Sequence, residues 1–117
     1  MTNVRKLASI VAVAAVTALP SALAVRPAAA QDASYTMTIG AKSFQPGSLT
    51  VKSGVKIKLV VSNASSKTAE FESSDLNREK VIAAGSSAVV YIGPLAPGSY
   101  GVFDDFNPSV KGQIVAK

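Results

Sequence analysis

From residue 35 onward, apolar and polar side chains alternate along most of the chain. Tyr35, Met37 and Ile39 alternate with threonines and a glycine, and every second residue from Val55 to Val61 is apolar. An alternation with period two places the apolar side chains on one face of an extended strand. The same criterion predicts further strands at 49–51, 69–73, 88–92, 100–103 and 113–116.

Turn-forming dipeptides separate the predicted strands: Pro46-Gly47, Ser53-Gly54, Ala84-Gly85, Pro97-Gly98 and Asn107-Pro108. About seven short strands at this spacing predict an all-β fold, a two-sheet Greek-key β-sandwich that forms a single domain. Residues 74–82 lack the alternation, so we expect a crossing loop there, with a helical turn capped by Ser74 or Asp75.

The beginning of the chain has the pattern of an export signal. Arg5 and Lys6 precede a mostly apolar run, 7–19, and Pro20 ends it. The run is too short to span a bilayer as a helix, and small residues typical of a cleavage site follow it.

We expect residues 1–30 to be a cleaved secretory signal peptide and residues 31–117 to be the mature domain. Cleavage after Ala30 is favoured because the polar Gln31 follows at once, and Ala24 is the alternative. A Sec-type signal of this kind predicts a periplasmic protein whose mature chain is not inserted in the membrane.

Removal of the signal changes the charge balance. The full chain has twelve basic and seven acidic side chains and a net charge of +5, whereas the predicted mature chain keeps nine and seven, which gives +2. Five lysines are spread over predicted strands and turns: Lys42, Lys52, Lys56, Lys58 and Lys67. With no aromatic RNA-binding motif among them, they predict no nucleic-acid binding. We interpret them as a solvated face, with a docking surface for an acidic partner as the alternative.

The composition excludes several kinds of chemistry. The chain has no cysteine and no histidine, so it has no disulfide, no thiolate and no imidazole ligand or base. Any metal ion must be bound by oxygen or by one of the two methionines. No nucleophile motif, phosphate-binding glycine loop or glycosidase pair is present, so we do not expect an enzyme that acts alone.

The acidic residues provide the candidate chemistry. Six of the seven fall in two groups: Glu70, Glu72, Asp75 and Glu79, and then Asp104 and Asp105. Glu70 and Glu72 share one face of a strand and can converge on one ion. Neighbouring aspartates in an extended chain point in opposite directions, so only one of that pair should face inward. Hard oxygen ligands suit iron, manganese or calcium and tolerate Cu(II). The alternative is that these acids simply pair with basic residues on the surface.

The order of residues resembles a cupredoxin. Its first half is carried by Phe44-x-Pro46-x-x-Leu49-x-Val51-x-x-Gly54, and its second half by Pro97-Gly98-x-Tyr100-x-x-Phe103. In blue-copper members the ligands are cysteine, histidines and methionine. On that pattern the cysteine corresponds to Asp104, the histidine of the last loop to Asn107 and the methionine to about Val110. The first histidine corresponds to Ala69 or Glu70. The resemblance therefore implies a cupredoxin-like sandwich without type 1 blue copper.

The resemblance is closer to the small periplasmic cupredoxins of bacterial ferrous-iron uptake, of the Ftr type, and to the cupredoxin domain of EfeO-type proteins. It is carried by three segments: Glu70-Phe71-Glu72-Ser73, Leu76-Asn77-Arg78-Glu79-Lys80 and Phe103-Asp104-Asp105-Phe106. It implies an iron or copper ion bound through carboxylates, for which the expected ligands are Glu70, Glu72, Glu79 and Asp104, with Asp105 in reserve.

The same resemblance implies partners and a role. Such proteins act beside a high-affinity iron permease of the inner membrane and a second periplasmic iron-uptake protein, and they assist the oxidation or delivery of ferrous iron. The alternative from another class is a non-metal periplasmic interaction module that has kept the sandwich after losing its metal site.

Overall fold

The computed structural model describes residues 12–18 and 33–117. Residues 12–18 have no regular secondary structure, and the rest of the predicted signal peptide lies outside the described residues. Its cleavage and the export route stay predictions. Within the described ranges, no helix has the length and apolar character needed to cross a bilayer.

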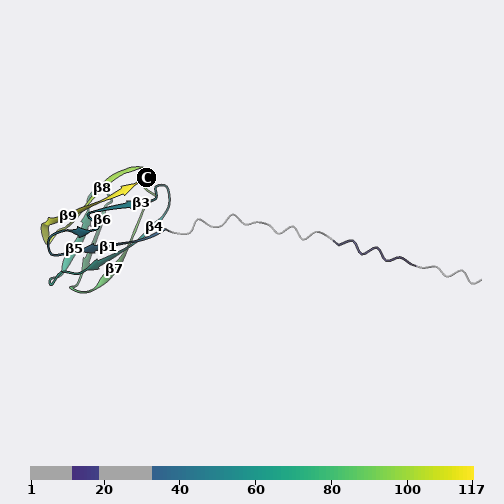
Figure 1. The fold of residues 1–117 in the computed structure, drawn as a ribbon, viewed down its shortest axis with the longest axis horizontal. Helices are drawn as coiled ribbons and strands as arrows, with labels where there is room; N and C mark the ends of the chain where they lie inside the picture. The colour runs from purple at the N-terminus through teal and green to yellow at the C-terminus, as the bar shows by residue number, and fades with distance from the viewer. Residues whose placement is uncertain (1–11, 19–32) are drawn as a thin grey trace, which may run out of the picture.

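Within residues 33–117, nine strands form two sheets that face each other (Figure 1). Their bounds are β1 (Ala33–Ile39), β2 (Phe44–Gln45), β3 (Ser48–Val51), β4 (Ile57–Asn63), β5 (Ala69–Ser73), β6 (Arg78–Ile82), β7 (Ser87–Ile92), β8 (Gly98–Asp104) and β9 (Asn107–Ala116). One sheet has the order β2-β1-β4-β7 and the other the order β3-β9-β8-β5-β6. The predicted all-β sandwich is therefore confirmed.

Both sheets are mixed, because each contains one parallel pair among antiparallel ones. β1 runs parallel to β4 and β3 runs parallel to β9, while β4–β7, β5–β6, β5–β8 and β8–β9 are antiparallel. Parallel neighbours require a connection that crosses out of the sheet. Between β1 and β4 the chain makes that crossing through two short successive strands, since β2 belongs to the first sheet and β3 to the second.

The core lies between the inner faces of the sheets, where the predicted alternation places it. Met37 and Ile39 of β1 and Leu59 of β4 are fully buried, and their sequence neighbours on the strands are not. Phe44 of β2 meets Phe71 of β5 edge to face, with ring centroids 6.3 Å apart and an interplanar angle of 68°. This aromatic pair connects one sheet to the other across the core.

The predicted crossing loop at 74–82 is wrong. Residues 74–77 form a tight turn, and the remainder is β6, which pairs antiparallel with β5. Four of the five β6 residues are exposed, because β6 is the edge of its sheet and only Ile82 reaches the core. Charged side chains are usual on edge strands, and they hide the alternation that the sequence criterion requires. Asn77 has a φ of 51°, which allows the turn to close without a helix.

The predicted turn at Asn107-Pro108 is also misplaced. The turn is at residues 105–106, and Asn107 already begins β9 opposite Asp104. β3 pairs only with residues 113–116 of β9, so the first part of β9 has no neighbour on that side. The missing N–H of Pro108 therefore costs no ladder hydrogen bond.

Candidate metal site

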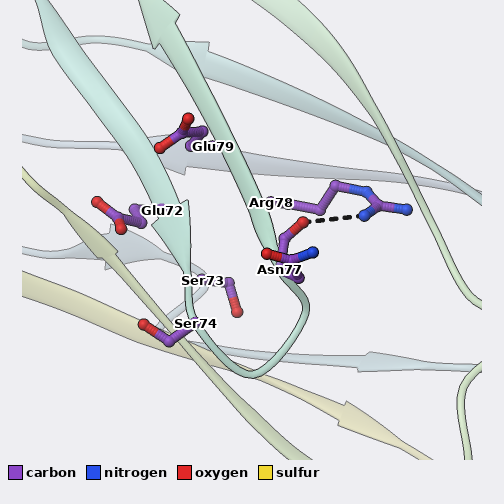
Figure 2. A pocket seen from close by; sticks show the side chains of 6 residues that line it. All are labelled: Glu72, Ser73, Ser74, Asn77, Arg78 and Glu79. Atoms are coloured by element: carbon purple, nitrogen blue, oxygen red, sulfur yellow. Dashed lines mark hydrogen bonds between the residues drawn. The ribbon is translucent and has the colours of Figure 1, made fainter.

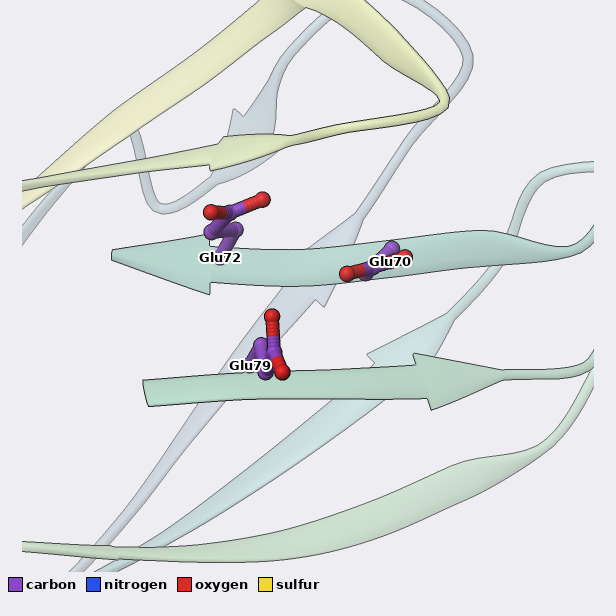
Figure 3. Close-up of side chains that lie close together, drawn as sticks. All are labelled: Glu70, Glu72 and Glu79. Atoms are coloured by element: carbon purple, nitrogen blue, oxygen red, sulfur yellow. The ribbon is translucent and has the colours of Figure 1, made fainter. Parts of the chain in front are cut away.

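Three glutamates converge on the outer face of the five-stranded sheet. Glu70 and Glu72 are two residues apart on β5 and are half-buried, and Glu79 of β6 lies directly opposite Glu72. One carboxylate oxygen from each lies within 4.8 Å of those from the other two. Figure 3 shows the three side chains on these neighbouring strands. The strand alternation produces the arrangement, since residues i and i+2 and their cross-strand partner share a face.

The concentration of negative charge alters the acidity of this group. Partial loss of hydration raises the pKa of the Glu70 carboxyl above its ordinary value of 4.5, and the charges of Asp105 and Glu79 raise it further. The pKa of Glu72 is raised in the same way, first by lost hydration and then by Asp105. Carboxylates held together repel one another unless a proton or a cation lies between them. The face is therefore suited to a bound cation.

A shallow pocket of about 380 Å³ opens beside two of the glutamates (Figure 2). It is lined by Glu72, Ser73, Ser74, Asn77, Arg78 and Glu79. The Arg78 guanidinium donates from Nε to the carbonyl of Tyr91 at 2.9 Å and from Nη1 to the carbonyl of Asn77 at 2.9 Å. These bonds hold the arginine toward the backbone of β7 and the turn.

Asp104 does not join the three glutamates. It is only 5% exposed and lies opposite Phe71, on the core face of β8 rather than the outer face. Its Oδ1 accepts hydrogen bonds from the backbone N–H of Glu70 at 2.9 Å and of Phe106 at 3.0 Å. The sequence contains a signal for this placement, because Asp104 and the buried Val102 are two residues apart on one strand.

Asp105, the reserve ligand, lies closer to the glutamates. Its backbone N–H donates to the carbonyl of Glu70 at 2.9 Å, and its negative charge contributes to the raised pKa of both Glu70 and Glu72. Asp75, by contrast, accepts a hydrogen bond from the N–H of Gly101 at 2.8 Å and braces the β5–β6 turn. The geometry thus offers Glu70, Glu72 and Glu79, with Asp105 beside them.

The positions that correspond to blue-copper ligands carry no thiolate, imidazole or thioether. Ala69 and Val110 are buried apolar residues, Asp104 accepts hydrogen bonds from the backbone, and Asn107 begins β9. A type 1 blue site depends on a cysteine thiolate, so this chain has none.

Sequence reasoning missed the part played by Asn63. This buried residue donates from Nδ2 to the carbonyls of Lys67 and Ile82, and its Oδ1 accepts from the N–H and hydroxyl of Ser65. These bonds fix the loop between β4 and β5, which leads directly into the glutamate strand. An asparagine that ends a buried strand on its inward face is a usable signal for such a role, because a buried amide needs partners.

Comparison with known proteins identifies the family. The chain belongs to the Cupredoxin-like domain family, which matches residues 7–116. An uncharacterized protein of Rickettsia prowazekii (strain Madrid E) is 39% identical over 71 residues, which cover 61% of this chain and 57% of that protein. The match thus spans little more than half the length of this relative.

Two solved structures illustrate the likeness in fold. The metal-binding domain of the Cu(I)-exporting P-type ATPase CopA of Streptococcus pneumoniae D39, solved with Cu(I), has a TM-score of 0.64 at 13% identity and covers 72% of this chain and 84% of that one. The purple cupredoxin of Nitrosopumilus maritimus has a TM-score of 0.57 at 18% identity and covers 74% of this chain and 100% of that one. At these identities the likeness establishes the fold alone.

Proposed function

We propose that this protein is an exported cupredoxin-like protein that binds an iron or copper ion on the outer face of its five-stranded sheet. The ligands are Glu70, Glu72 and Glu79, with Asp105 close enough to add a fourth carboxylate. The observation that carries the proposal is the convergence of three carboxylate oxygens within 4.8 Å. Ferric iron is a hard cation and ferrous iron a borderline one; carboxylate oxygens are suitable ligands for both, and Cu(II) tolerates them.

The exposure of the site suits the delivery of an ion more than its permanent storage. Glu79 is exposed and Glu70 and Glu72 are half-buried, so the carboxylates approach an ion from one side. The remaining coordination positions stay open to water or to ligands of another chain. In the proposed role, the protein works in the periplasm and assists the oxidation of ferrous iron or its delivery to an inner-membrane iron permease, together with a second periplasmic iron-uptake protein.

Metal titration tests the proposal. The purified protein is titrated anaerobically with Fe(II) and Mn(II), and separately with Cu(II), while native mass spectrometry measures stoichiometry and calorimetry measures affinity. We expect one ion per chain, and an affinity at least tenfold lower in Glu72→Gln. The matched control is Asp75→Asn, which also removes one negative charge but keeps an oxygen to accept the Gly101 N–H.

Equal affinities in the wild type and Glu72→Gln would contradict the proposed site. Binding by Cu(II) but by neither Fe(II) nor Mn(II) would reject the iron role and retain copper. An intense blue absorption band with copper would contradict the exclusion of a type 1 site.

The second candidate is an interaction module that binds no metal. It is favoured by the outer face of the four-stranded sheet, where Val89 is 41% and Tyr91 50% exposed. The ammonium group of Lys56 lies 5.0 Å from the centroid of the Tyr91 ring. A pair of exposed apolar and basic groups of this kind is typical of protein-binding surfaces. Failure of all three metals to bind more tightly than about millimolar would favour this candidate.

A further inference from the structure

A second polar pocket, separate from the glutamates, lies where two loops meet the β8–β9 turn. Its volume is about 300 Å³. It is lined by Gly40, Ala41, Ser65, Ser66, Lys67, Thr68, Asp104, Phe106 and Asn107, none of which lines the pocket beside Glu72 and Glu79. This volume is at the low end of the range for small-molecule sites, which begins at about 300 Å³.

The pocket contains one buried carboxylate with unused capacity. Asp104 is 5% exposed, and two backbone N–H groups donate hydrogen bonds to its Oδ1. Among residues 33–117, no group donates a hydrogen bond to Oδ2. Within that same part of the chain every fully enclosed side-chain oxygen has a partner, so Oδ2 is reached from the pocket. A carboxylate oxygen of a largely buried residue that is reached only from a pocket gains most from a positively charged hydrogen-bond donor.

The remaining lining favours an organic cation over a metal ion. Asp104 is the single acid among the lining residues, and a divalent ion would need several anionic or strongly donating ligands. Ser66 and Thr68 supply hydroxyl groups, and the ring of Phe106 is 56% exposed beside them. One carboxylate, neutral acceptors and an aromatic ring are the groups that bind an ammonium ion. Lys67, the one basic residue of the lining, is exposed and can keep its charged end in water.

The wall of the pocket is fixed without a ligand. Asn63 bonds to Ser65 and to the carbonyl of Lys67, and the Ser65 hydroxyl also donates to that carbonyl at 2.9 Å. The loop that carries Ser66 and Thr68 is therefore anchored at both ends. A prearranged site loses less entropy when a ligand binds. We propose that the Asp104 pocket binds the primary ammonium group of a small amine.

Amide NMR spectroscopy tests this proposal on the full protein. The N–H groups of Glu70 and Phe106 donate to Asp104 and report on its carboxylate directly. With n-propylammonium as the probe, we expect the amide resonances of Phe106, Ser66 and Thr68 to shift saturably. The half-saturation concentration should be on the order of millimolar. The neutral isostere n-propanol is expected to cause no saturable shift, and this comparison requires no variant.

Two variants assign the site. Asp104→Asn removes the charge but keeps an oxygen for both N–H donors, so the fold is expected to persist and the affinity to fall at least tenfold. Asp75→Asn is the matched control, since it removes the charge of a carboxylate outside the pocket, keeps an oxygen for the Gly101 N–H and should leave propylammonium binding unchanged. The failure of metal binding at the glutamates would not affect this result.

Three outcomes would overturn the proposal. The first is that the amide shifts do not saturate at propylammonium concentrations up to about a hundred times the expected half-saturation concentration. The second is equal binding by the wild type and Asp104→Asn. The third is displacement of propylammonium by Mg²⁺ or Mn²⁺ at lower concentration with shifts of the same amides, which would make the pocket a metal site.

Discussion

Among residues 33–117, the Asn63 side chain makes hydrogen bonds to three backbone groups, in Ser65, Lys67 and Ile82. Its amide reaches the carbonyls of Lys67 and Ile82, and its oxygen accepts two donors from Ser65. Asn63 is 1% exposed and its bond to Ile82 is buried, so the Ile82 carbonyl would be left without a partner or water if the amide were removed. One side chain therefore connects the end of β4, the following loop and the end of β6.

Asn63→Ala should destabilise the protein by about 2–3 kcal/mol, since buried backbone groups lose their partners. The free energy of unfolding measured by urea denaturation checks this value. Asn107→Ala, at an exposed position, is the control and is expected to change stability by no more than about 0.5 kcal/mol. Equal losses in the two variants would mean that burial of the Asn63 bonds does not matter.

The acidic residues of the candidate site show which side-chain positions the sequence predicts and which it does not. The pairing of Glu70 with Glu72 follows from strand periodicity, and the structure brings them together with Glu79. Asp104 is expected beside them from its position near the end of β8, but the structure places it on the core face. The alternation of β8 runs unbroken from the buried Val102 to Asp104, so the direction of this side chain could be predicted from its own strand.

The β5–β6 hairpin is the element that creates the candidate metal site. β6 was not predicted as a strand, because its exposed charges lack a period of two. Only the pairing with β5 places Glu79 opposite Glu72, and such pairing depends on contacts that a single strand pattern does not contain. The acidic composition of the site was predictable, whereas the register that assembles it was not.

Glu72→Gln should raise the thermal midpoint of the metal-free protein at neutral pH. The pKa of Glu72 is raised in the folded state, so above the ordinary value of 4.5 the native state holds more protons than the unfolded state. The wild-type protein therefore loses stability as the pH rises from 4.5 through the raised pKa. Replacing the carboxyl with an amide removes this loss.

Thermal melts of both proteins between pH 4.5 and 7.5 measure the effect. The difference between their midpoints should be largest at neutral pH and should shrink toward pH 4.5, because the folded state takes up the Glu72 proton as the pH falls through the raised pKa and the unfolded state is about half protonated at 4.5. Lys80→Gln, on the same hairpin but of the opposite charge, is the control and should not show this pattern. A wild type that is more stable than Glu72→Gln at neutral pH would contradict repulsion among the glutamates.

For the molecule as a whole, the two sheets depend on a continuous apolar layer. Phe71 of the five-stranded sheet is fully buried and packs against Phe44 of the other sheet. Phe71→Ala should reduce the free energy of unfolding by about 3–5 kcal/mol, because it removes burial and leaves a cavity between the sheets. Phe106→Ala, the same change at a 56% exposed position, should cost far less. Urea denaturation of the two variants measures the contrast, and equal losses would place the Phe71 contact outside the cooperative core.

The overall fold was the most predictable level. Tyr35 to Ile39, Val55 to Val61 and Ala88 to Ile92 all follow the period of two; the first and third lie within β1 and β7, and the second overlaps β4. A half-buried sheet imposes that period on any chain that forms it, so the prediction needs no tertiary information. The choice of neighbours in each sheet depends on contacts far apart in the sequence and was beyond the reach of the pattern.

The parallel pairing of β3 with β9 affects how this protein is made. Ser48 lies opposite Gln113, 65 residues later in the chain. β9 also separates β3 from β8, so β3 has no neighbour in the five-stranded sheet until β9 has been synthesised. Contacts between such distant residues slow folding, because a long loop must close before they form. A nascent chain with this order of strands therefore completes its five-stranded sheet only after β9 has left the ribosome, so the sheet forms after translation rather than during it.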